Sequence, residues 1–162
     1  MTFRSPGSRP SPRIQRHHIP EGPIQDFTTI IENTSAEDWQ KRTSALQALV
    51  STIPPSYEND NDNSNDNHHH PHDDWYNSPP TLRHLAIPLS ELIKDARSTV
   101  VKRTCESLNE LFSKCKTDAK YLLKDLMPSV CQVHASTVQV IRNIVQAMIL
   151  ETFSKFPCKK SV

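Results

Sequence analysis

Hydrophobic residues follow the 3.6-residue spacing of amphipathic helices along most of the chain, and polar stretches interrupt the pattern at regular places. The helical stretches are residues 23–33, about 35–53, 82–93, 97–115, 121–133 and 137–156. Short polar loops join them two by two, so the pattern predicts an all-α fold of three helix pairs. In the last pair, the residues expected to face inward are Tyr121, Leu122, Leu123, Leu126, Met127, Val130 and Val133, and then Val138, Ile141, Ile144, Val145, Met148, Ile149 and Phe153.

Each pair repeats the same order of a helix, a polar loop and a second helix with an arginine about one turn into it. The arginines are Arg42, Arg103 and Arg142, and the last two are 39 residues apart. The first interval is 61 residues, and removing a polar, histidine-rich block of about 22 residues returns it to 39. A period near 40 with two helices per unit is typical of HEAT and armadillo arrays, in which neighbouring units bury one another's apolar faces. We therefore predict a HEAT-repeat α-solenoid domain at 23–155, with repeats at about 23–53, 81–115 and 118–155.

Other residues recur in phase with these arginines. Pro88 and Pro128 are 40 residues apart, and each lies inside the first helix of its pair. Pro88 is expected to kink that helix, because proline lacks a backbone N–H and crowds the preceding turn. The recurring arginines are predicted to be structural and to bind carboxylates or carbonyls of the neighbouring repeat. In the first loop, Ser35 is expected to cap the second helix while Asp38 reaches back.

Three segments lack this helical pattern. Residues 1–22 are rich in proline, serine and arginine, and residues 55–80 are acidic and rich in histidine, asparagine and aspartate. Neither has enough apolar surface to order the chain, so both are predicted to be disordered, and 156–162 form a C-terminal tail. The histidine tract could loosely hold a transition metal, but it offers no fixed second shell for the ligands, so we predict no metal and no other cofactor.

Charge and missing motifs exclude several classes of protein. The net charge is +1, yet residues 81–162 contain thirteen bases and seven acids, which favours an acidic partner. No stretch approaches the length of a transmembrane helix, and the N-terminus lacks the apolar region of a signal peptide, so no membrane association is expected. The chain has two glycines, no phosphate-binding loop, no H-E-x-x-H and no nucleophile elbow, which argues against an enzyme. Without C-x-x-C spacing, the four cysteines are interpreted as reduced thiols.

The loops inside the three pairs are the candidate binding site. They are T-S-A-E-D-W at 34–39, K-D-A-R-S at 94–98 and Q-V-H-A-S at 132–136. Stacking would align them on one edge and place Trp39, Arg97 and His134 in a row, about 10 Å apart. Trp39 is either an exposed interface anchor or a core residue that closes the first pair. Arg97 could also be held in a local ion pair with Asp95.

The segments D-W-Q-K-R-T-S-A-L-Q-A-L, L-I-K-D-A-R-S-T-V-V-K-R-T-C-E-S-L and L-M-P-S-V resemble the N-terminal half of a TOG domain, closest to the CLASP group of microtubule-associated proteins. About three of the six repeats of that domain are covered. The resemblance implies that the loop edge binds tubulin, with Trp39 as the first-loop anchor, Arg97 and Ser98 as second-loop contacts, and Lys102 nearby. His134 stands in the third loop, where such domains usually offer a lysine.

The expected function is therefore a tubulin- and microtubule-binding module that regulates microtubule dynamics. By the same resemblance, expected partners extend to other microtubule plus-end or kinetochore proteins, and the expected location is the cytoplasm and cytoskeleton, including the spindle in cell division. The alternative is a HEAT-repeat protein-interaction scaffold without tubulin affinity. Nucleic acid is a disfavoured partner, because no aromatic and arginine pair recurs at base-reading positions.

Overall fold

The computed structural model describes residues 22–54 and 75–156, and within these ranges all regular structure is helical. The predicted all-α class is therefore confirmed. The helices are α1 (Pro23–Asn33), α2 (Trp39–Ser51), α3 (Pro79–Arg83), α4 (Ala86–Ile93), α5 (Ser98–Cys115), α6 (Lys120–His134) and α7 (Gln139–Lys155). Short 3₁₀ turns lie at Ala36–Asp38, Trp75–Asn77 and Lys116–Ala119. The predictions for residues 1–21, 55–74 and 157–162 lie outside the described residues.

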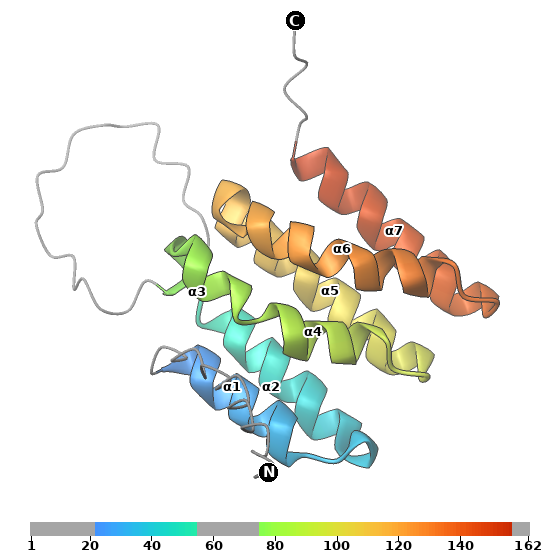
Figure 1. The fold of residues 1–162 in the computed structure, drawn as a ribbon, viewed down its shortest axis with the longest axis horizontal. Helices are drawn as coiled ribbons and strands as arrows, with labels where there is room; N and C mark the ends of the chain where they lie inside the picture. Colours follow the sequence, from blue (N-terminus) through green and yellow to red (C-terminus); the bar gives the residue numbers. More distant parts are fainter. Residues whose placement is uncertain (1–21, 55–74, 157–162) are drawn as a thin grey trace, which may run out of the picture.

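The helices form three pairs that lie side by side in two layers (Figure 1). One layer contains α1, the α3–α4 segment and α6, and the other contains α2, α5 and α7. Helix α5 is central, because it packs against α2, α4 and α7. The apolar stripes meet between the layers, where residues such as Leu46, Leu92, Leu108 and Val145 are buried. Each pair thus buries part of its apolar face against its neighbour.

The last residues of the insertion predicted at 55–80 are ordered, from Trp75 onward. Trp75 and Tyr76 are half-buried, pack against the core and meet edge to face with ring centroids 5.9 Å apart. Pro79 is the first residue of α3, a position that suits proline because the first N–H groups of a helix have no partner in the helix. The prediction of disorder is therefore wrong for residues 75–80, because the two aromatic rings bury surface against the core.

Pro88 interrupts its helix as predicted, but the break lies one turn before it. The chain leaves the α-helical pattern at His84 and Leu85, whose N–H groups donate to carbonyls three residues back, at 3.1 and 3.0 Å. Residue 84 is the one whose carbonyl a proline at 88 crowds and cannot satisfy. In the third pair, Pro128 lies inside α6, which remains one helix.

Two other local predictions need correction. Ser35 makes no capping bond to the backbone; its hydroxyl lies 3.5 Å from Asp38 Oδ2, and a 3₁₀ turn separates it from α2. Tyr121, Val138 and Phe153, which were expected to face inward, are exposed. In the described part of the chain, α6 and α7 form the last pair of the array, so no further pair covers their outer sides.

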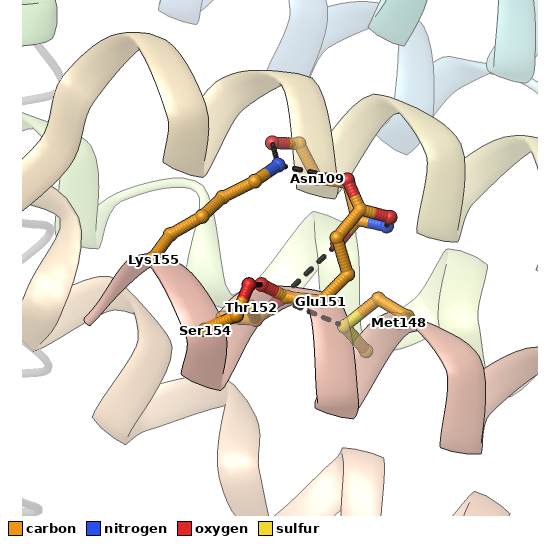
Figure 2. Close-up of polar contacts among 6 residues, drawn as sticks. All are labelled: Asn109, Met148, Glu151, Thr152, Ser154 and Lys155. Carbon is orange, nitrogen blue, oxygen red and sulfur yellow. Dashed lines mark hydrogen bonds and ion pairs between the residues drawn. The ribbon is translucent and has the colours of Figure 1, made fainter. Parts of the chain in front are cut away.

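A polar cluster joins α5 to α7, which are neighbours in the same layer (Figure 2). The Thr152 hydroxyl, which is 1% exposed, donates to Asn109 Oδ1 at 3.1 Å, and Asn109 Nδ2 donates to Glu151 Oε2 at 2.6 Å. Lys155 Nζ donates to the Asn109 carbonyl at 3.2 Å and to Glu151 Oε1 at 2.8 Å. These bonds fix the rotation of α7 on α5, because each side chain has a partner on the opposite helix or one turn away.

Replacing Thr152 by valine is expected to lower the free energy of unfolding by about 1 kcal/mol, because it removes a buried hydrogen bond while keeping the side-chain shape. The thermal midpoint should fall by about 4 °C. Ser154→Ala is the matched control, since the Ser154 hydroxyl is exposed and bonds only within its own helix turn. Equal stability of the two variants, measured by urea unfolding, would show that this cluster does not hold α7 against α5.

Candidate functional site

The three loops inside the helix pairs lie along one edge of the molecule, on the right in Figure 1. Each loop follows the C-terminus of a helix in one layer (α1, α4 or α6) and precedes the N-terminus of its partner in the other layer (α2, α5 or α7). Opposite helix ends therefore meet in every loop, and their dipoles largely cancel. The charge that this loop edge presents is set by its side chains.

Trp39 is the first residue of α2 and is half-buried against the core. The Arg103 guanidinium, from α5 of the next pair, lies over its ring with Cζ 5.6 Å from the ring centroid. This distance is that of a cation–π contact. The indole is thus neither wholly enclosed nor free at a loop tip: it packs on the core, carries an arginine over its ring, and keeps part of its surface open.

Arg97 and Lys102 are exposed, Arg97 at the second loop and Lys102 about one turn into α5. The Arg97 backbone N–H donates to Asp95 Oδ1 at 2.8 Å, and its Nη1 lies 3.6 Å from Asp95 Oδ2. Lys102 Nζ lies 4.0 Å from Glu106 Oε1, with both side chains largely in solvent. Ser98, the first residue of α5, is half-buried. The local pairing expected for Arg97 is therefore present, and it holds the second loop in shape.

The third loop is less basic than the second. His134 is the last residue of α6 and is half-buried. Arg142, one turn into α7, donates from Nε and Nη2 to the Ser136 carbonyl at 3.2 and 3.0 Å. The Ser136 hydroxyl accepts from the Val138 N–H at 3.2 Å. These hydrogen bonds hold the third loop in shape. His134 lies at the start of this loop and only part of its side chain is exposed.

The three recurring arginines do not form one ladder. Arg42 is buried, and its Nη2 donates at 3.1 Å to Glu91 Oε2 in the neighbouring pair, which is the type of contact predicted. Arg142 instead bonds a carbonyl of its own pair, so the prediction is wrong there. Arg103 does reach the neighbouring pair, but it stacks on the Trp39 ring. The three arginines thus occupy similar places in their helices but have different partners.

The three cysteines in the described helices differ in exposure. Cys105 and Cys115 are buried, and burial raises the pKa of each to about 12. Both thiols are therefore protonated at neutral pH, and they are poor nucleophiles because only the thiolate form reacts readily. Cys131 is exposed. Within residues 22–54 and 75–156, no group of three histidine, cysteine or acidic side chains could hold a metal ion, and no helix is long and apolar enough to cross a membrane.

Comparison with protein-family models, with curated proteins and with solved structures finds no match to this chain.

Proposed function

We propose that the chain is a HEAT-repeat α-solenoid of the TOG type, similar to CLASP domains, and that it binds tubulin through the loop edge. The observation that supports this most is the alignment of the three loops on one edge, with the indole of Trp39 only half-buried there. Tryptophan and arginine dominate the binding energy of protein interfaces, and a rigid indole partly open to solvent loses little freedom on binding. The edge places both residue types within one surface.

The charges around Trp39 fit an acidic protein surface such as that of tubulin. Exposed bases near the edge are Lys41, Lys94, Arg97, Lys102 and Arg103. Glu37 and Asp38 are exposed acids there, whereas Asp95 is mostly buried and already paired with Arg97. The excess of bases would steer an acidic partner toward the edge and make association sensitive to salt.

In this proposal the chain acts by holding tubulin and thereby regulates microtubule dynamics. Trp39 is the anchor, Arg97, Ser98 and Lys102 form the second contact, and His134 borders the third. The cellular setting that goes with the proposal is the cytoplasm and cytoskeleton, with microtubules and the spindle, and with plus-end or kinetochore proteins as further partners.

The alternative is a HEAT-repeat scaffold that binds another protein and has no affinity for tubulin. The stacking of Arg103 on Trp39 favours this alternative, because the indole then has a structural role as a contact between the first and second pairs. Co-elution with tubulin in size-exclusion chromatography distinguishes the two functions: a scaffold of this kind would elute alone.

Arg97→Glu is expected to weaken tubulin binding about fivefold, because a charge at the rim of an interface mainly changes association and its salt dependence. Lys124→Glu is the matched control, since Lys124 is exposed on α6 away from the loops and its replacement changes the net charge equally. Binding is measured by co-elution and by anisotropy at two salt concentrations. Equal losses from both variants would reduce the effect to net charge, and no binding by the unmodified chain would reject tubulin as its ligand.

A further inference from the structure

A groove of about 310 Å³ lies between α1 and the α3–α4 segment, outside the loop edge. Ile31 and Pro88 form part of its apolar floor, and both are buried. Ile87 stands on its wall and is 75% exposed, more than any other large apolar side chain in the described residues. The break at His84, which lines the groove, shapes it, because the chain turns there between α3 and α4. The groove can therefore accept an apolar side chain.

The charge in this groove that has no partner among the described residues is the carboxylate of Glu32. Arg83 also lines the groove and its side chain is 55% exposed, but its Nε and Nη2 donate to Asp125 of α6 at 2.6 and 3.3 Å, which also raises the pKa of Arg83 above its ordinary value. Glu91 accepts a hydrogen bond from Arg42, yet its side chain remains 54% exposed. Glu32 is exposed on α1 and has no ion pair among the described residues. An occupant with an apolar side chain next to a basic one fits these walls best.

We propose that the groove binds the arginine-rich segment that precedes α1 in this same chain, through residues 13–19. That segment reads R-I-Q-R-H-H-I, so it offers two isoleucines, each within three residues of an arginine. Residues 1–21 contain four arginines and one acid, Glu21. The isoleucines complement Ile87 and the apolar floor, and the arginines complement Glu32 and Glu91. This occupant does not depend on tubulin binding, since the groove lies on other residues.

The position of the segment in the chain favours this contact. Gly22 has φ 115°, a backbone conformation that glycine adopts without strain, and it is the residue immediately before Pro23, where α1 begins. The groove residues of α1, from Thr28 to Glu32, lie about 8–14 Å along the helix from Pro23 at 1.5 Å per residue. An extended chain covers that distance in about three to five residues. Tethering at this range gives an effective concentration on the order of millimolar, so weak contacts suffice for binding.

Site-specific photocross-linking in the full chain tests the proposal. Ile87 is replaced by p-benzoylphenylalanine, and the cross-linked peptides are identified by mass spectrometry. The matched control has the same replacement at Asn33, which is exposed on α1 beside Glu32 but does not line the groove. Cross-links from position 87 to residues 13–19, and none from position 33, are the expected result. Equal cross-links from the two positions would show that the tether alone brings the segment near, and would overturn the proposal.

Charge reversal then tests which residues of the segment bind. Arg13→Glu with Arg16→Glu should lower the cross-link from position 87 about fivefold, the effect of losing two exposed ion pairs. Arg4→Glu with Arg9→Glu makes the same change in charge farther from α1 and should leave the cross-link nearly unchanged. Equal losses would mean general attraction without a docked segment. A cross-link between two chains that grows with protein concentration would place the segment of a second copy in the groove and overturn the intramolecular contact.

Discussion

Trp39→Ala is expected to lower the affinity for tubulin about thirtyfold, which is the cost of removing a hot-spot side chain worth about 2 kcal/mol. The same change should lower the free energy of unfolding by about 1 to 2 kcal/mol, because the half-buried indole packs on the core and lies under the Arg103 guanidinium. Affinity is measured by anisotropy well below the thermal midpoint, so that the folded fraction is the same for both proteins.

Trp39→Phe separates the two roles of the indole. A phenyl ring keeps an aromatic face for Arg103, so most of the stability should remain, while the loss of indole surface and of its N–H should still weaken binding. Full binding by Trp39→Ala would exclude the anchor role and leave the indole as a contact between the first and second pairs. An unfolding midpoint unchanged by Trp39→Ala would instead show that the stacking with Arg103 contributes nothing measurable.

The helical pattern predicts the fold best where one face of a helix is buried and the other is open. The start of α1 at Pro23, the length of α5 and the pairing through short loops follow directly from apolar spacing and from helix end signals. The pattern fails at the outer side of the array, because the spacing of apolar residues marks a stripe and does not say whether another helix covers it. Phe153 and Val138, which the pattern places on the inward stripe, are exposed for this reason.

The site was harder to predict than the fold, because its contacts join residues far apart in the chain. The loop positions of Trp39 and Arg97 follow from the sequence, and so does the pairing of Arg97 with its near neighbour Asp95. The contact of Arg103 with Trp39 depends on how α5 lies against α2, which periodicity does not fix. A signal was present in the sequence. Trp39 lies three residues before Arg42, so the two side chains share a face of α2, and Arg42 is the residue of the first pair that corresponds to Arg103 in the second.

The buried Arg42 guanidinium should make the first two pairs unusually sensitive to the loss of Glu91. Glu91→Ala is expected to lower the free energy of unfolding by about 2 kcal/mol, because it leaves a positive charge buried without its carboxylate. Arg42 is 7% exposed, and within the described residues its Nε is buried without a hydrogen-bond partner. Arg42→Met removes both the charge and this unpaired N–H, and should therefore cost less, about 1 kcal/mol or below.

A double-mutant cycle in urea shows whether this asymmetry is real. Once Arg42 is methionine, removing Glu91 should cost little, since its side chain is half in solvent and no buried charge depends on it. Lys102 and Glu106 form the matched control: they are an exposed pair of the same charges, and their coupling should stay below about 0.5 kcal/mol. A coupling of Arg42 with Glu91 as small as this would contradict the burial of the guanidinium between the pairs. A large coupling would show that this ion pair makes the stacking of the first pair on the second depend on one carboxylate of α4.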